Sequence, residues 1–221
     1  MARFGAVFDW DGVICDTGAM HKRSWELLAE EIGRDFTDAM FKESFGMRNV
    51  NIIPELWDWS HDPAEIQRLS DRKEFLFREI LRADKIEPLA GVRTFLEGLK
   101  SAGIPCVVGS STVRENIACA VDVMGLRAYF TDFVCSEDVS RGKPHPDVFL
   151  TGAERIGVPA ARCVVFEDAH VGIEAAKAAG MRVVALTTTH PRATLQDADK
   201  VLDRLDEITP DDLLPWFDGK G

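Results

Sequence analysis

Five short apolar runs divide the sequence, and each is followed by a polar turn and a helical pattern. The runs are AVF (6–8), IPCVVG (104–109), FVCS (133–136), CVVF (163–166) and VVAL (183–186). Continuous apolar strands that alternate with amphipathic helices are typical of a parallel sheet that is buried on both faces. The pattern therefore predicts an α/β fold with a doubly wound, Rossmann-like parallel sheet.

One interval breaks this alternation. Between Asp16 and about Pro88 there is no comparable strand, and the apolar residues recur at helical spacing, with breaks expected at Pro54 and Pro63. Connections in compact α/β units are usually a few residues long, so this insertion predicts a second domain. We expect a core domain formed by residues 1–16 and 88–221, and a helical cap domain, residues 17–87, that acts as a lid over a site beside the first strand.

Reactive side chains follow the first four runs, and ligands of open α/β sheets bind outside the carboxyl ends of the strands. In chain order these side chains are Asp9 and Asp11, Ser110 and Ser111, Lys143, and Glu167 and Asp168. Carboxylates favour a hard cation such as Mg²⁺, whereas the ammonium and hydroxyl groups favour an anion. The sequence therefore predicts a site for a magnesium ion and a phosphate group.

The chemistry of phosphoryl transfer suggests a role for each group. Asp9 can attack phosphorus and form an aspartyl-phosphate, and Asp11, two residues along the same strand, can protonate the leaving oxygen and later deprotonate water. Asp168, with Glu167, would complete the magnesium site. Lys143 would neutralise the charge of both the phosphate and the carboxylates.

Four motifs in this chain together resemble those of the haloacid dehalogenase superfamily. They are DWDGV, GSS, GKPHPDVF and FEDAHVGIEAAKAAGM, and their order is similar to that of the subfamily with a helical cap after the first motif, in the β-phosphoglucomutase-like group. By motif position, the resemblance implies the nucleophile Asp9, the acid/base Asp11, the phosphate ligands Ser110 and Lys143, and the magnesium ligand Asp168. It also implies that the backbone carbonyl of Asp11 binds the metal.

Some of these residues have a structural alternative. Asp9 and Asp11 could form a polar turn, and Ser110 could cap a helix that begins near Thr112. Glu167 could bind the metal or accept hydrogen bonds from nearby backbone. Ser111 is expected to shape the phosphate loop.

Three residues of the cap are candidates for binding the substrate. They are His21, Lys73, and Arg48 after a Gly46-Met47 turn, although an exposed basic residue on a helix more often faces only solvent. The segment DTGAMHKRSW resembles β-phosphoglucomutases, in which a histidine occupies the His21 position. The segment GMRNVNIIPELWDWSHDPAEIQRLSDRKE instead resembles plant-type phosphatases of ribitylamino-uracil phosphate.

These observations favour a magnesium-dependent phosphatase of a small phosphorylated metabolite, with a sugar phosphate as the expected substrate. A hexose phosphate mutase, a ribitylamino-uracil phosphate phosphatase and a non-catalytic ligand-binding protein remain alternatives. The second aspartate, Asp11, disfavours a dehalogenase, because the family's dehalogenases usually lack it. Phosphonoacetaldehyde hydrolases share a Trp at the Trp10 position but have a small residue at the Asp11 position, which disfavours that activity too.

Charge and composition exclude other classes of function. The net charge of -11 disfavours binding to nucleic acids and anionic membranes, although a local site can still be positive. The sequence has no long apolar run, and its five cysteines lack CxxC spacing, so they are expected to be free, mostly buried thiols. We therefore expect a cytoplasmic monomer with a small phosphorylated molecule as its partner.

Overall fold

The computed structural model describes residues 3–44 and 47–217, so Gly46 of the expected turn lies outside the described residues. The chain forms two compact units, one of residues 1–16 and 87–221 and the other of residues 17–86. We describe each by itself.

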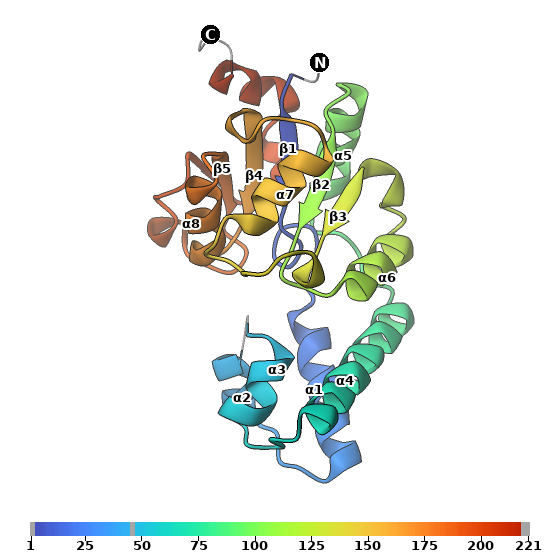
Figure 1. Cartoon of the computed structure of the whole chain (residues 1–221). Coiled ribbons are helices and arrows are strands. Elements are labelled where there is room, and N and C mark those ends of the chain that lie inside the picture. Colours follow the sequence, from blue (N-terminus) through green and yellow to red (C-terminus); the bar gives the residue numbers. More distant parts are fainter. Residues whose placement is uncertain (1–2, 45–46, 218–221) are drawn as a thin grey trace. The chain divides into compact units, whose positions relative to one another are not determined.

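The first unit contains a parallel sheet with the strand order β3-β2-β1-β4-β5-β6 (Figure 1). Its strands are β1 (Gly5–Phe8), β2 (Cys106–Gly109), β3 (Asp132–Val134), β4 (Cys163–Glu167), β5 (Arg182–Leu186) and β6 (Lys200–Leu202). The chain moves outward from β1 on one side and then returns to build the other side, which confirms the predicted doubly wound sheet. The edge strand β6 was not predicted.

Helices cover both faces of this sheet because successive strand residues point to opposite faces. Val7 of β1 joins an apolar cluster with α7 (Asp147–Arg155) and α8 (His170–Ala178), and Figure 1 shows α7 lying across the strands. On the other face, Phe8 stacks on Phe166 of β4 at a centroid distance of 4.5 Å, and Phe95 of α5 (Val92–Ser101) packs edge-on against Phe8. The remaining long helix of this unit is α6 (Arg114–Met124).

The second unit is helical. Its elements are α1 (Gly18–Ile32), α2 (Asp38–Ser44), α3 (Asn49–Asn51), a π-helical segment (Ile52–Leu56) and α4 (Pro63–Asp84). The break predicted at Pro63 is present, because α4 begins at this residue. The Asp62 side chain caps α4 by accepting a hydrogen bond from the Ala64 N–H. Pro54 does not break a helix, because it lies inside the π-helical segment.

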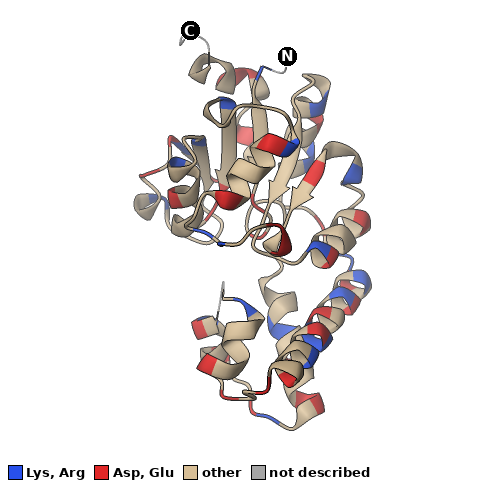
Figure 2. Ribbon diagram, viewed as in Figure 1, with Lys and Arg blue, Asp and Glu red and all other residues tan. Residues whose placement is uncertain are grey.

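This helical unit has its own apolar core. Trp25 of α1 packs edge-on against Trp57 at a centroid distance of 4.7 Å, and Trp59 lies beside both indoles. Leu28 and Leu69 join the same cluster from α1 and α4. Figure 2 shows that α4 carries basic and acidic residues along its length, and neighbours such as Arg68 and Glu65 form ion pairs on its surface.

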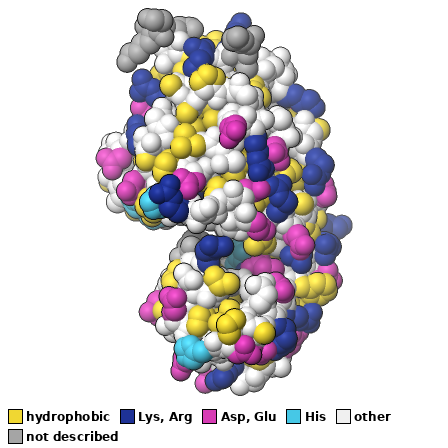
Figure 3. All heavy atoms as spheres, in the orientation of Figure 1, with side chains coloured by type: hydrophobic (Ala, Val, Ile, Leu, Met, Phe, Trp, Pro, Cys, Tyr) yellow, Lys and Arg dark blue, Asp and Glu magenta, His cyan; other side chains and the backbone are white. Residues whose placement is uncertain are grey.

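The charged surface, the helix lengths and the cysteine thiols can be compared with what the composition predicts. On the face drawn in Figure 3, Lys and Arg side chains lie interspersed with Asp and Glu side chains. No helix in the described part of the chain is long and apolar enough to cross a membrane. All five cysteines are free, and every one except the half-buried Cys119 is buried, which confirms the expectation for the thiols.

Candidate active site

Asp9 lies immediately beyond the end of β1, where its backbone N–H donates to the carbonyl of Phe166 on the neighbouring β4. The residue as a whole is only 8% exposed. Lys143 Nζ donates to Asp9 Oδ1 at 2.6 Å and to Glu167 Oε1 at 2.5 Å. Residues that are far apart in the sequence thus form one buried ionic cluster at the carboxyl edge of the sheet.

The end of β4 supplies the other two acids of this cluster. Asp9, Glu167 and Asp168 each place a carboxylate oxygen within 4.8 Å of the others, and all three residues are buried. Glu167 Oε2 accepts hydrogen bonds from the backbone N–H groups of Asp168 (2.7 Å) and Ala169 (2.8 Å). Glu167 therefore accepts hydrogen bonds from the nearby backbone and also belongs to the acidic cluster, so both alternatives, metal ligand and backbone acceptor, stay open.

The cluster holds three carboxylates against one ammonium group. Burial raises the pKa of Asp9 well above its usual value, and the charges of Glu167 and Asp168 add to this increase while Lys143 opposes it. Burial and the charge of Glu167 raise the pKa of Asp168 to about 7. Burial lowers the pKa of Lys143, but the charges of Asp9 and Glu167 outweigh that effect and raise it overall. A divalent cation would relieve this excess of buried negative charge.

Asp11 lies outside this acidic cluster. The prediction that Asp11 lies on the first strand is wrong, because β1 ends at Phe8 and strand alternation does not set the direction of the Asp11 side chain. Instead, Asp11 forms an isolated bridge with Cys15, and its Oδ2 accepts a hydrogen bond of 3.0 Å from the hydroxyl of Thr112. Asp11 is half-buried, and the loop after β2 therefore restrains its carboxylate.

Ser110 is buried at the end of β2, where its backbone N–H donates to the carbonyl of Val134 on β3. Its Oγ accepts a hydrogen bond from the Thr112 N–H at 3.1 Å, which leaves the hydroxyl proton free to be donated. Ser111 is exposed in the same loop. The following helix begins at Arg114 with Val113 as its N-cap, two residues after the expected start near Thr112, so Ser110 does not cap it.

Sequence reasoning missed several residues around this site. The Thr112 hydroxyl reaches Asp11, and Thr189 Oγ1 lies 2.6 Å from Asp168 Oδ2 in the loop after β5. The Thr188 hydroxyl donates to the carbonyl of Gly12. The same question that found the other residues, namely which side chains follow each strand, would have found Thr188 and Thr189 had it been asked of the fifth run.

Two of the three predicted cap residues lie together inside the helical unit. Lys73 is buried, and its Nζ lies 2.7 Å from His21 Nδ1 and 3.2 Å from Glu74 Oε1. The His21 ring stacks on Phe77 at a centroid distance of 4.0 Å. Asn49 Nδ2 donates to the same Glu74 oxygen at 2.6 Å. This is a built polar cluster and not a solvated helix face.

The Lys73 contact fixes the proton on the His21 ring. An ammonium group can only donate, so Nδ1 is an acceptor and the neutral ring carries its proton on Nε2. Burial and the charge of Lys73 lower the pKa of His21 to about 3. His21 is therefore a neutral hydrogen-bond donor near neutral pH.

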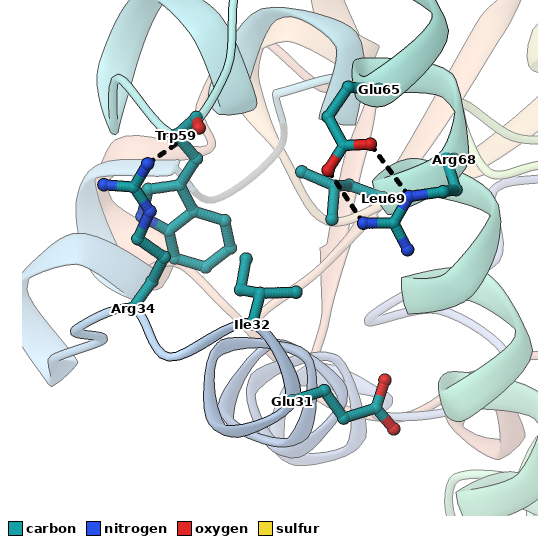
Figure 4. A pocket seen from close by; sticks show the side chains of 7 residues that line it. All are labelled: Glu31, Ile32, Arg34, Trp59, Glu65, Arg68 and Leu69. Atoms are coloured by element: carbon teal, nitrogen blue, oxygen red, sulfur yellow. Dashed lines mark hydrogen bonds and ion pairs between the residues drawn. The ribbon is translucent and has the colours of Figure 1, made fainter.

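The third predicted cap residue, Arg48, and a separate pocket also belong to the helical unit. Arg48 is exposed at the N-cap position of α3. A pocket of about 460 Å³ opens elsewhere on the unit, and Figure 4 shows the Arg68 and Glu65 side chains paired on its wall and Arg34 bonded to the carbonyl of Trp59. None of the predicted site residues lines this pocket.

Comparison with known proteins gives the family. A model described as haloacid dehalogenase-like hydrolase matches residues 5–180. The chain is 36% identical over 211 residues to the chloroplastic 5-amino-6-(5-phospho-D-ribitylamino)uracil phosphatase of Arabidopsis thaliana, and the match covers 95% of this chain and 56% of that protein. It is 32% identical over 182 residues to the fructose-1-phosphate phosphatase of Escherichia coli, which covers 81% of this chain and 94% of that protein.

A solved structure agrees with these matches. The β-phosphoglucomutase from Clostridium difficile aligns with a TM-score of 0.83 and 25% identity, covering 98% of this chain and 97% of that one. The matches confirm the predicted resemblance and the predicted enzyme class, a phosphatase-type hydrolase. The family match to residues 5–180 agrees with the order of the motifs and with the parallel sheet whose strands carry them. The chain belongs to the haloacid dehalogenase-like hydrolase family.

Proposed function

We propose that this chain is a magnesium-dependent phosphatase that hydrolyses the phosphate monoester of a small polyhydroxylated metabolite, a sugar or sugar-alcohol phosphate. The observation that carries the proposal is the buried cluster of Asp9, Lys143, Glu167 and Asp168. It combines a nucleophile, a cation for the phosphate and carboxylates for a metal at the edge of the sheet where such folds bind ligands.

The acidic cluster fits Mg²⁺. We assign Asp9 and Asp168 as its side-chain ligands, Glu167 as a further ligand or orienting group, and Asp11 as a ligand through its backbone carbonyl. Bound Mg²⁺ would supply positive charge that keeps Asp9 ionised and offsets charge on the phosphate oxygens. The raised pKa values of Asp9 and Asp168 support this assignment, because they report crowded buried anions that lack sufficient positive charge.

The two aspartates of the first motif divide the chemistry. Asp9 Oδ attacks phosphorus, the ester bond breaks, and an aspartyl-phosphate forms. Asp11 gives a proton to the leaving alkoxide and, now ionised, takes a proton from the water that hydrolyses the aspartyl-phosphate. The Thr112 hydrogen bond supports this role because it helps to hold the Asp11 carboxylate in one orientation.

Lys143 and the β2 loop hold the phosphate in this scheme. Lys143 is fixed between Asp9 and Glu167, so its ammonium stays beside the nucleophile and neutralises charge there. Ser110 donates its free hydroxyl proton to a phosphate oxygen, and Ser111 contributes from the same loop. These groups position phosphorus for attack.

We assign recognition of the rest of the substrate to the helical unit. His21 offers an Nε2–H donor that stays neutral, which suits a sugar hydroxyl better than proton transfer. Lys73 holds that ring in place, and Arg48 provides an exposed positive charge for an anionic substrate group. The cap as a lid over the acidic cluster is part of this proposal.

The relatives support the substrate class. The Arabidopsis and Escherichia coli relatives are named for esters that carry phosphate on a ribityl chain and on fructose. Both of these substrates are phosphate monoesters of polyhydroxylated chains, the substrate class that we propose for this chain. Ribitylamino-uracil phosphate itself is a second candidate, since the relative named for it is 36% identical across 95% of this chain.

A hexose phosphate mutase is a further candidate, favoured by the His21–Lys73 pair and by the β-phosphoglucomutase of known structure. A mutase returns the phosphate to a second hydroxyl of the sugar, whereas a phosphatase gives it to water. The two differ in products, so one assay separates them.

The test is a phosphorus NMR time course with Mg²⁺. The substrates are fructose 1-phosphate, ribitylamino-uracil phosphate, a nucleoside monophosphate, and glucose 1-phosphate with a trace of its 1,6-bisphosphate. Asp9→Asn serves as the matched inactive control. Growth of the inorganic phosphate signal from the polyhydroxylated esters, abolished by EDTA and by Asp9→Asn, is the expected result.

Other outcomes assign the alternatives. Conversion of glucose 1-phosphate to glucose 6-phosphate without phosphate release would make the chain a mutase. Turnover of ribitylamino-uracil phosphate alone would narrow the substrate to that compound. No turnover of any ester would favour a non-catalytic member of the family.

A further inference from the structure

The loop after β5 folds back onto Asp168, the residue that we assign as a magnesium ligand. Thr189 Oγ1 lies 2.6 Å from Asp168 Oδ2 and 3.1 Å from the Asp168 carbonyl oxygen. His190 Nδ1 lies 2.9 Å from Thr189 Oγ1 and 3.1 Å from the same carbonyl. Two consecutive polar residues therefore converge on Asp168 from outside the acidic cluster.

The number of protons determines the direction of these hydrogen bonds. A threonine hydroxyl has one proton, and Asp168 in the ionised form that binds a cation can only accept it. The contact with Asp168 Oδ2 is also the shorter of the two contacts that Thr189 makes with Asp168. Because that proton is used, the close contacts of His190 Nδ1 require that nitrogen to donate. His190 therefore carries a proton on Nδ1, and hydrogen bonds run from His190 to Thr189 and from Thr189 to Asp168 Oδ2.

Asp168 Oδ2 is enclosed on a second side. A Cβ atom built on Gly12 would overlap this oxygen, so the carboxylate lies against the turn that follows Asp11. The Thr188 hydroxyl holds that same turn by donating to the Gly12 carbonyl. The β5 loop thus fixes both the carboxylate and the backbone against which it packs, and Oδ1 is the oxygen left for a cation.

We propose that Thr189 is a positioning residue for Asp168, supported by His190, and that its hydroxyl holds Oδ2 so that Oδ1 is presented to the divalent cation. This inference rests on the proposed magnesium-dependent function. Groups that orient a metal-ligating carboxylate raise the affinity of the site for the metal, because the carboxylate loses less conformational freedom when the metal binds.

The test measures metal affinity directly, without substrate. Mn²⁺ binding to the purified chain is followed by electron paramagnetic resonance, with Mg²⁺ as competitor. Thr189→Val removes the hydroxyl and keeps the shape, and we expect Mn²⁺ affinity to fall by about tenfold or more. Thr189→Ser keeps the hydroxyl and should bind within about threefold of the natural chain. Thr189 is exposed, so neither change disturbs packing.

Two further variants complete the design. Thr187→Val is the matched control, since this neighbouring hydroxyl bonds to Asp203 and should leave Mn²⁺ affinity unchanged. His190→Phe removes the supporting donor, and a smaller loss, of about threefold, is expected. Circular dichroism and thermal unfolding would establish that each variant is folded.

The outcomes separate this inference from the proposed function. Equal Mn²⁺ affinity for Thr189→Val and the natural chain would overturn the positioning role while leaving the magnesium site standing. Failure of the natural chain itself to bind Mn²⁺ or Mg²⁺ would overturn the magnesium-dependent function and this inference with it. A loss in Thr189→Val that Thr189→Ser restores would support both.

Discussion

Lys143 Nζ lies 2.6 Å from Asp9 Oδ1, and both side chains are nearly inaccessible to solvent. Asp9→Asn removes one of three crowded anions and leaves Lys143 paired with Glu167, so the fold should persist with an unfolding temperature equal to or above that of the natural chain. Turnover should fall by about three orders of magnitude or more, because an amide is a poor nucleophile. Phosphate release and thermal unfolding measure the two effects, and activity close to that of the natural chain would remove Asp9 as the nucleophile.

Lys143→Met should have the opposite effect on stability. It leaves the buried Asp9 and Glu167 without their cation, and the free energy of unfolding without Mg²⁺ should fall by about 3 kcal/mol. Urea denaturation measures the change. Lys177→Met is the control, since that lysine is 41% exposed in its pair with Asp199 and should change stability by less than about 1 kcal/mol. Equal effects of the two substitutions would contradict the assigned role of Lys143.

Gly172→Ala tests the role of Glu167. A Cβ at this helical position would overlap the Glu167 carboxylate, which must then leave the N–H groups of Asp168 and Ala169. We expect lower stability and weaker Mn²⁺ binding, although alanine favours helices by about 1 kcal/mol over glycine. Gly98→Ala, whose Cβ would lie 3.4 Å from Pro210, is the matched control and should be neutral or stabilising. A stabilised Gly172→Ala would show that Glu167 moves at no cost.

Thr112→Val tests the restraint on Asp11. Loss of the hydroxyl removes one hydrogen bond from the Asp11 carboxylate. If that bond is worth roughly 1.4 kcal/mol, kcat should fall by about tenfold with KM little changed. Thr112→Ser should recover most of the rate. Steady-state kinetics on the best substrate give both constants. An unchanged kcat in Thr112→Val would mean that Asp11 is positioned by other groups.

His21 should remain neutral over the whole physiological range. Its folded pKa of about 3 lies below the ordinary value of 6.5, so the unfolded chain binds more protons between these values. The contribution of His21 to stability is therefore complete above about pH 6.5 and is lost as the pH falls toward 3. Long-range ¹⁵N NMR should show the Nε2–H tautomer at pH 7, and His21→Asn should flatten the acid limb of the stability profile. A His21 signal that titrates near pH 6 would contradict this prediction.

The sheet was predictable because its central strands are buried on both faces, and burial leaves continuous apolar runs such as CVVF. The edge strand β6 is three residues long and begins with the exposed Lys200, so it has no such signal. Similarly, Pro54 is a sound indicator of a helix break, but a π-helical segment, whose hydrogen-bond pattern cannot be read from the sequence, accommodates it.

The acidic site was predictable to the extent that parallel strands end at a common edge, which brings together Asp9, Lys143 and Glu167. Strand periodicity could not predict the direction of the Asp11 side chain, because the strand ends before that residue. The Thr189 contact depends on how one irregular loop folds back, and TTTH taken alone is an ordinary polar loop. Side-chain direction in loops is set by tertiary contacts that leave no periodic trace in the sequence.

The helical unit interrupts the chain directly after the strand at the centre of the sheet, and this order matters during synthesis. On the ribosome, β1 emerges before residues 17–86, which contain an apolar core of their own, and these residues emerge before either neighbour of β1. During synthesis β1 can therefore pair first with β2 and only later with β4. Because Glu167 ends β4 and Asp168 follows it, the acids of the site can come together only after β4 has been made.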